Sequence, residues 1–155
     1  MESKTVVIGA GPAGMMAAAA SAGRGIDTVL IEKNRTVGKK LLITGKGRCN
    51  ITNNTDIQGL VDNTPGNGSF LYSSFYSFSN EDLINFFNEN GLKTKVERGG
   101  RVFPVSDRAE DVVNTLSSVI DACGVKLMPQ SHAVDVIALN GRVREVVLAD
   151  GQRLE

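Results

Sequence analysis

The 155-residue chain has no tryptophan, one histidine and two cysteines. The single histidine, His132, excludes a histidine-rich metal site, and we expect no bound metal. Cys49 and Cys123 are too few for a disulfide framework, and neither belongs to a Cys-x-x-Cys motif. No apolar run reaches the roughly 18 residues that a membrane-spanning helix needs. An excess of one charge is also missing, because 17 Lys and Arg balance 17 Asp and Glu.

A chain of net charge zero has no overall field that would attract nucleic acid or anionic lipid. We therefore expect no nucleic-acid partner and no membrane partner, and a cytoplasmic location. Lys4 before an apolar run and the small residues at 20–22 imitate a secretory signal. Gly9, Gly11 and Gly14 would break the apolar helix of such a signal, so we reject that interpretation.

Glycine is the residue that the chain has in excess. It accounts for 17 of the 155 residues, about 11% against an average near 7%. The 41% hydrophobic and 22% charged fractions are those of a globular protein, and the length suits about one domain. The glycine excess predicts places where the backbone comes close to another group.

The N-terminal segment predicts a strand, a helix and a strand. Thr5–Ile8 is a β-branched run without alternation, which is typical of a strand buried on both faces. Pro12 opens an alanine-rich helix that is expected to end near Gly23. Thr28–Ile31 repeats the buried-strand pattern, and Val125–Met128 would add a third short strand. Together these elements predict a βαβ crossover with parallel strands.

Two helices are predicted in the middle of the chain. The first has Ser79 or Asn80 as its N-cap and continues through Asn90. The second has Ser106 as its N-cap and carries apolar residues at helical spacing as far as Cys123. The loops expected before these helices are 33–54 and 63–69.

The C-terminal segment predicts an antiparallel meander. Ser131–Leu139 and Arg142–Ala149 flank Asn140-Gly141, the strongest short signal of a hairpin. Asp150-Gly151 predicts a second turn, and Gln152–Glu155 would begin a strand with no partner strand after it. We therefore expect an incomplete sheet whose edge is a candidate surface for self-association.

The segment Gly9–Gly14 has the pattern Gly-x-Gly-x-x-Gly after a predicted strand and at the start of a predicted helix. Glu32 stands 18 residues beyond Gly14, at the end of the second strand, which completes a dinucleotide-binding fingerprint. In that motif Gly9 permits the tight turn, Gly11 lets a pyrophosphate approach the backbone, and Gly14 lets helix and strand pack closely. Glu32 would accept both hydroxyls of an adenosine ribose. The alternative is a glycine-rich turn with a structural glutamate.

A second feature, Lys39–Asn50, combines cations and glycines directly after the second strand. Gly45 and Gly47 would let backbone amides approach a flavin, and Arg48 or Lys40 would balance the charge of its reduced, anionic ring. The alternative is a basic loop that faces water. Nucleic-acid binding is not supported, because no aromatic residue that could stack on a base lies among these cations.

Four stretches together resemble the BaiN-like flavoproteins, a family of NAD(P)/FAD-dependent oxidoreductases that includes aminoacetone oxidase-like enzymes. They are the Gly9–Gly14 motif, the Glu32-Lys33 pair, the segment Gly38–Asn53 and the segment Gly100–Pro104. The resemblance implies an α/β fold: a Rossmann-like FAD/NAD(P)-binding βαβ domain with a partial parallel sheet and an attached antiparallel β-meander. It covers the N-terminal, smaller part of the family's chain. Residues 1–155 would thus form one FAD-binding domain that is truncated at its C-terminus and lacks the family's inserted substrate domain.

The resemblance also implies which residues meet FAD. Residues of the first motif would contact the pyrophosphate, and Glu32 with Lys33 would lie at the adenosine ribose. Val134 would offer its backbone to the adenine edge. The residues expected at the pyrophosphate are Gly9, Gly11, Pro12, Ala13 and Gly14, and those toward the flavin half are Lys40, Leu41, Gly47, Arg48, Cys49 and Asn50.

The remaining chemical residues carry weaker signals. Arg48 beside Cys49 would lower the pKa of its thiol, but we favour a noncatalytic cysteine there, and a core position for Cys123. His132 is expected to be a packing or surface residue, and Asp107 with Arg108 to open a helix. The aromatic cluster is interpreted as a core patch under the helix at 80–90, with a cofactor-side cleft as the alternative; it comprises Phe70, Tyr72, Phe75, Tyr76 and Phe78.

Two functions from different classes remain. In the first, the chain is the FAD-binding portion of an oxidoreductase that transfers hydride between a small-molecule substrate and flavin N5, with NAD(P)H as a candidate electron donor to the full-length parent. In the second, it is a stand-alone ADP- or NAD-binding module or a noncatalytic fragment. No catalytic residue can be named from the sequence.

Overall fold

The computed structural model describes residues 4–155, which form two compact units. The terminal unit contains the chain up to Lys40 together with Leu116–Glu155. The central unit is Leu41–Thr115. Helix α5 (Ala109–Ala122) begins in the central unit and ends in the terminal unit. Within the described residues, no helix combines the length and the apolar character needed to span a membrane.

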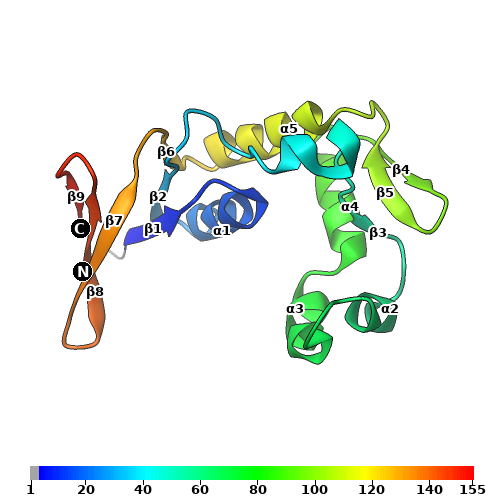
Figure 1. Cartoon of the computed structure of the whole chain (residues 1–155), viewed down its shortest axis with the longest axis horizontal. Coiled ribbons are helices and arrows are strands. Elements are labelled where there is room, and N and C mark those ends of the chain that lie inside the picture. The colour runs from blue at the N-terminus through cyan, green and yellow to red at the C-terminus, as the bar shows by residue number, and fades with distance from the viewer. Residues whose placement is uncertain (1–3) are drawn as a thin grey trace. The chain divides into compact units, whose positions relative to one another are not determined.

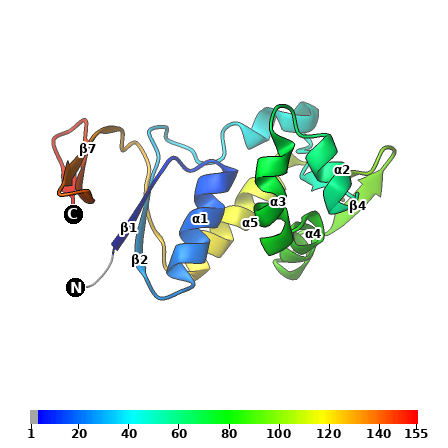
Figure 2. The ribbon, with the colours of Figure 1, turned by 90° about the horizontal axis from the view of Figure 1, so that it is seen from below.

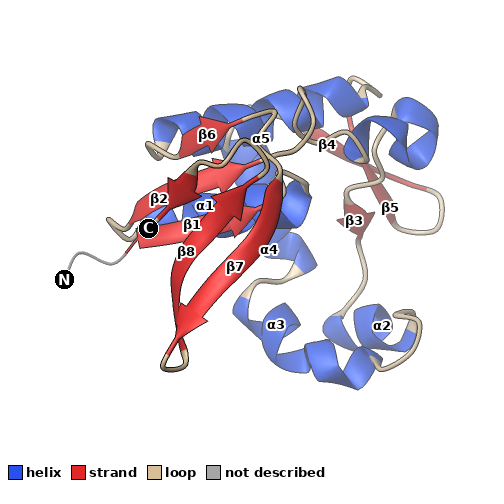
Figure 3. Ribbon diagram, turned by 60° about the vertical axis from the view of Figure 1, so that its left-hand side comes forward, coloured by secondary structure: helices blue, strands red, loops and turns tan. Residues whose placement is uncertain are grey.

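The terminal unit is built on a parallel sheet of β1 (Lys4–Ile8), β2 (Asp27–Ile31) and β6 (Lys126–Met128), with β2 in the middle. Val6 lies opposite Val29 in the parallel register, and α1 (Pro12–Ala22) connects β1 to β2. Figures 1 and 3 show this crossover. The predicted βαβ unit and the predicted third strand are therefore confirmed.

Strand β2 is covered on both faces, because its alternate side chains meet different elements. On one face the Thr28 hydroxyl donates to the Ser21 Oγ of α1 over 2.9 Å. On the other face Val29 and Ile31 pack in a core cluster with residues of the C-terminal meander. Figure 2 shows α1 and the meander on opposite sides of β1 and β2. The same expectation is wrong for β1, which lies at the sheet edge and leaves Ile8 55% exposed.

The meander is confirmed and consists of β7 (Ala133–Leu139), β8 (Arg142–Leu148) and β9 (Arg153–Leu154). Asn140 and Gly141 both have positive φ angles, 52° and 73°, as a tight two-residue hairpin turn requires. Strand β9 pairs with β8, and its buried Leu154 joins the core cluster with Val146 and Leu148.

The central unit combines short helices with a small antiparallel sheet. Strands β3 and β4 flank β5, with Val102 of β5 opposite Thr52 on one side and Val96 on the other. The sequence predicted none of these strands and only one of the unit's short helices. The elements are η1 (Leu41–Gly47), β3 (Thr52–Asn53), α2 (Ile57–Asp62), η2 (Gly68–Leu71), α3 (Tyr72–Ser77), α4 (Asn80–Glu89), β4 (Thr94–Glu97) and β5 (Arg101–Pro104).

The two predicted helices begin differently from one another. Helix α4 has the expected N-cap, since the Ser79 hydroxyl accepts from the Asp82 amide and the Asp82 carboxylate accepts from the Ser79 amide. Helix α5 begins at Ala109, so Ser106 is not its N-cap. The chain first makes a turn in which Asp107 has a φ of 57° and its amide donates to the Pro104 carbonyl over 3.0 Å. Asp107 therefore precedes α5 and does not open it.

The aromatic cluster is not a core patch. Phe70 and Tyr76 are 79% and 73% exposed, and Tyr72 stacks on Tyr76. Helix α4 packs against another element, because the buried Asn80 amide donates to the carbonyls of Asn53 and Thr55 at the end of β3. The position under α4 that the sequence assigned to these aromatic residues is thus wrong.

Gly14 provides a test of the packing between β1 and α1. A Cβ atom at Gly14 would lie 1.9 Å from the Gly9 carbonyl oxygen, whereas one at Gly11 would meet no atom of residues 4–155 within 4 Å. Gly14→Ala should lower the free energy of unfolding by about 1–3 kcal/mol, because helix and strand must separate. Gly11→Ala is the matched control and should lower it by no more than about 1 kcal/mol, because alanine is a poorer N-cap than glycine but its Cβ atom causes no clash. Urea unfolding measures both; equal stabilities would contradict the packing argument.

Candidate functional site

The connection between β1 and α1 has the geometry of a tight turn. Gly9 has a φ of 99°, and its amide donates to the Ile31 carbonyl over 2.8 Å. Gly14 lies against the Gly9 carbonyl, with no room for a Cβ atom. The conformational reasons given for Gly9 and Gly14 from the sequence are therefore confirmed.

The first turn of α1 presents backbone rather than side chains. Gly11 is the N-cap and has extended backbone (φ −78°), so its missing Cβ is not required by its conformation. Pro12 and Ala13 follow and are exposed. The first amides of a helix have no partner within it and carry partial positive charge. An anion can therefore approach the backbone here with little steric obstruction.

Glu32 lies at the same corner with its carboxylate turned into the chain. The side chain is buried, with 8% exposure. One oxygen, Oε2, accepts from the Ala10 amide over 2.9 Å, and the other accepts from the backbone and side-chain amides of Asn34 over 2.9 and 2.6 Å. Burial raises the pKa of Glu32, but the hydrogen bonds from Asn34 and Ala10 outweigh it and lower the pKa below its ordinary value.

These hydrogen bonds limit what else Glu32 can bind. A carboxylate has about four acceptor positions. Three are taken by Ala10 and Asn34, which leaves Oε2 with room for one more donor. Asn34 is a residue that the sequence argument missed. The signal that could have found it is an amide side chain two residues after an acidic strand end, where it can reach back to the carboxylate.

Val134 is placed where its backbone is available. It is 56% exposed and lies on β7 at a register shift: Ala133 pairs with Leu148 and Asp135 with Val147, but Val134 has no cross-strand partner. Such a bulge leaves the backbone groups of one residue outside the ladder. The geometry is compatible with the expected backbone contact. Of the other predicted residues in the terminal unit, Lys33 and Lys40 are exposed.

The central unit contains the other predicted residues, in a loop of unusual backbone. Gly45 and Gly47 have φ angles of 54° and 84°, and the non-glycine residues Lys46 and Cys49 have 58° and 60°. Left-handed backbone is unfavourable for residues with a side chain. The Cys49 amide donates to the Thr44 carbonyl over 3.1 Å, which closes the loop. Leu41 opens η1 and is half-buried, whereas Asn50 is exposed.

Cys49 is a buried thiol. Its residue is 1% exposed, and burial raises the pKa of the thiol, with only partial compensation by a hydrogen bond with Thr44. The expectation that Arg48 lowers this pKa is therefore wrong, because its guanidinium binds Glu97 and Asp107 instead. The expectation of a noncatalytic Cys49 agrees with this environment. Cys123 is half-buried, and His132 is exposed just before β7.

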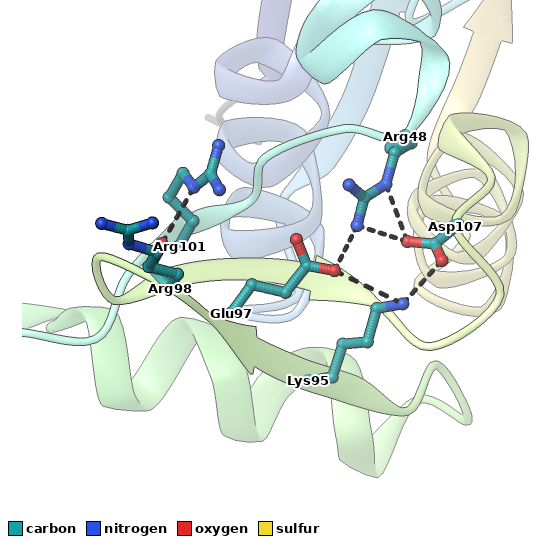
Figure 4. A network of polar contacts seen from close by, with 6 residues as sticks. All are labelled: Arg48, Lys95, Glu97, Arg98, Arg101 and Asp107. Carbon is teal, nitrogen blue, oxygen red and sulfur yellow. Dashed lines mark hydrogen bonds and ion pairs between the residues drawn. The ribbon is translucent and has the colours of Figure 1, made fainter.

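Arg48 belongs to a four-residue ion-pair network, defined by Arg48, Lys95, Glu97 and Asp107 (Figure 4). Its guanidinium donates to Asp107 over 2.8 Å and to Glu97 over 2.5 Å. Lys95 Nζ lies 2.6 Å from the Asp107 carboxylate and 3.6 Å from that of Glu97. The Arg48 hydrogen bond lowers the pKa of Glu97, and the Lys95 hydrogen bond is the main cause that lowers the pKa of Asp107. Two cations and two anions balance one another within the network.

The model of the HI0933-like protein Rossmann domain matches residues 3–155. The chain is 34% identical over 150 residues to a 3-dehydro-bile acid delta(4,6)-reductase of Clostridium scindens, which covers 95% of this chain and 35% of the relative. It is 30% identical over 139 residues to a ribosomal RNA dihydrouridine synthase of Haemophilus influenzae, which covers 86% of this chain and 33% of the relative. It thus spans about a third of the length of these curated relatives.

A solved structure supports the fold. A 3-ketosteroid-delta4-(5alpha)-dehydrogenase from Rhodococcus jostii matches with a TM-score of 0.71 and 16% identity, over 96% of this chain and 42% of that chain. At this identity the match concerns the fold alone. It agrees with the Rossmann-like architecture built on β1, α1 and β2.

The lowered pKa of Glu32 predicts a pH dependence of stability. Since the folded-state pKa lies below the unfolded value of about 4.3, Glu32 stabilises the fold fully above that pH and ceases to do so as pH falls through the folded pKa. Glu32→Gln should lower the free energy of unfolding at pH 7 by about 1–3 kcal/mol, with a smaller loss at pH 3. Urea unfolding at both pH values measures this. The exposed Glu89→Gln is the control, and a loss independent of pH would contradict the argument.

Proposed function

The chain belongs to the HI0933-like protein Rossmann domain family, and from this premise we propose that it binds FAD as the dinucleotide-binding portion of a flavin-dependent oxidoreductase. The observation that carries the proposal is the corner at the start of α1. There an open backbone position at Gly11, the free amides of a helix N-terminus and the buried carboxylate of Glu32 occur together. These groups match the pyrophosphate and the ribose of a dinucleotide.

In this proposal the terminal unit holds the ADP half of FAD. The backbone of Gly9, Gly11, Pro12, Ala13 and Gly14 faces the pyrophosphate. Glu32 accepts one ribose hydroxyl at Oε2, rather than both, because Ala10 and Asn34 take its other acceptor positions. Lys33 lies beside the ribose, and the unpaired backbone of Val134 meets the adenine edge. A carboxylate at this position disfavours a 2′-phosphate, so NADP fits this corner poorly.

The flavin half of FAD would be met by residues of the segment Lys39–Asn50. We assign Lys40, Leu41, Gly47, Cys49 and Asn50 to it, Cys49 through its backbone because its thiol is buried. Many contacts are needed, because a helix dipole contributes about 0.3–1 kcal/mol and micromolar binding needs about 8 kcal/mol. When bound, FAD supplies hydride acceptance and donation at N5, while the protein binds and orients it.

The names of the relatives narrow the reaction that we propose for the whole protein. One relative is a 3-dehydro-bile acid delta(4,6)-reductase, and another is a ribosomal RNA dihydrouridine synthase. Both names describe addition of hydrogen to an unsaturated substrate. We therefore propose that bound reduced flavin would supply a hydride from N5 to one carbon of a substrate double bond, that a proton from solvent would complete the other carbon, and that NAD(P)H would reduce the flavin again.

FAD binding is tested directly on the 155-residue chain. Titration with FAD, followed by quenching of flavin fluorescence and by the visible flavin absorption, should give a saturable complex. Gly11→Val should raise the dissociation constant at least about tenfold, because its side chain would occupy the space of the pyrophosphate. Thermal unfolding should show that this variant remains folded.

The control for Gly11→Val is Ala20→Val, an exposed position of α1 beyond its first turn. It should bind FAD as the unchanged chain does. Binding of ADP without any binding of FAD would support the alternative of a nucleotide-binding module. Unchanged FAD affinity in Gly11→Val would contradict the placement of the pyrophosphate.

A further inference from the structure

We propose that Arg48 is a positioning residue that holds the backbone of the loop 44–50 for the flavin half of FAD, and that it does not supply charge to the cofactor. The inference rests on the proposed function, which places this loop at FAD. It differs from the expectation that Arg48 balances the charge of a reduced flavin. The structure supports it through the backbone of the loop, the partners of Arg48 and the charge of the network.

The loop has a backbone that needs external support. Thr44 is extended, and Gly45, Lys46, Gly47 and Cys49 all have positive φ angles. Two of these four residues carry side chains, for which such a backbone is unfavourable. Conformations of this kind persist where the surrounding structure holds them. Arg48 lies between two of these residues, and its side chain ties the loop to distant segments.

The partners of Arg48 come from two different elements. Glu97 lies on β4, and Asp107 lies in the turn between β5 and α5. The guanidinium also lies over the buried ring of Phe103, 4.1 Å from its centroid. Three anchors from separate segments therefore fix this side chain, and with it the backbone on either side.

The pairing of Glu97 is selective. In the antiparallel register Glu97 lies opposite Arg101, the position from which a cross-strand ion pair is expected. Its ion pairs are instead made with Arg48 and Lys95, as Figure 4 shows. The carboxylate thus pairs with the loop and with its own strand, and makes no ion pair with Arg101 across the hairpin.

The charge of Arg48 is already compensated. Arg48 and Lys95 carry two positive charges, and Glu97 and Asp107 carry two negative charges, so the network is neutral. A neutral network has little field to offer an anionic ring. Of the two cations that the sequence suggested for that task, Lys40 is the one that this network leaves available.

The two roles of Arg48 predict opposite effects of removing its carboxylate partners. If Arg48 positions the loop, Arg48→Met and the double variant Glu97→Gln/Asp107→Asn both loosen it. If Arg48 supplies charge, the double variant frees its positive charge and should strengthen FAD binding. Arg48→Lys separates the roles further, because an ammonium keeps the charge but cannot make the same forked contacts.

The first measurement needs no cofactor. Hydrogen exchange of the amides of 44–50 in the FAD-free chain should be at least about tenfold faster in Arg48→Met, in Arg48→Lys and in the double variant. The controls are Arg108→Met, whose ion pair with Glu110 is exposed, and Glu89→Gln/Glu110→Gln, which changes the charge equally. Exchange in the controls should not change. Unchanged exchange in all Arg48 and carboxylate variants would overturn the proposal.

The second measurement is FAD affinity. The dissociation constant should rise about tenfold or more in the same three variants and stay constant in the two controls. Tighter binding by the double variant, or unchanged binding by Arg48→Lys, would overturn the proposal in favour of charge supply. If the unchanged chain does not bind FAD at all, the proposed function fails, and hydrogen exchange alone decides the role of Arg48 in the loop.

Discussion

The close approach of α1 to β1 is the constraint on which the candidate site depends. It exists because Gly14 has no Cβ atom to meet the Gly9 carbonyl oxygen, 1.9 Å from where that atom would lie. This approach turns the chain so that the Ala10 amide reaches the Glu32 carboxylate across 22 positions of sequence. The open start of the helix and the acidic end of the second strand therefore occur at one corner.

Carboxylates in both units bind backbone or cations of the chain itself. Glu32 accepts from amides of Ala10 and Asn34. It thereby joins the turn between β1 and α1 to the segment that follows β2. In the central unit, Glu97 and Asp107 join the loop around Arg48 to a hairpin and to the turn before α5. In each case the carboxylate helps to hold a loop in place. The hydrogen bonds that it accepts lower its pKa. For Glu32, these contacts leave one acceptor position at Oε2.

The elements that were predicted correctly are those whose signals are local. The helix of Pro12–Ala22, the helix capped at Ser79 and the Asn140-Gly141 hairpin each depend on a few neighbouring residues. The elements that were missed depend on distant partners. Strand β5 is held between β3 and β4, and the short strand β3 has too few residues to show a period of its own. Exposed aromatic residues at 70–78 were misplaced because composition alone does not distinguish a core from a surface cluster.

The sequence by itself determined the βαβ unit, the glycine turn and the position of Glu32 directly after the second strand, because these follow from local backbone preferences and a fixed spacing. It also carried the family resemblance that the comparisons confirm. Only the tertiary structure decided which groups the side chains of Glu32 and Arg48 bind. A side chain's charge is visible in a sequence, but its hydrogen-bond partners at positions 59 residues away are not, since they depend on which segments the fold brings together.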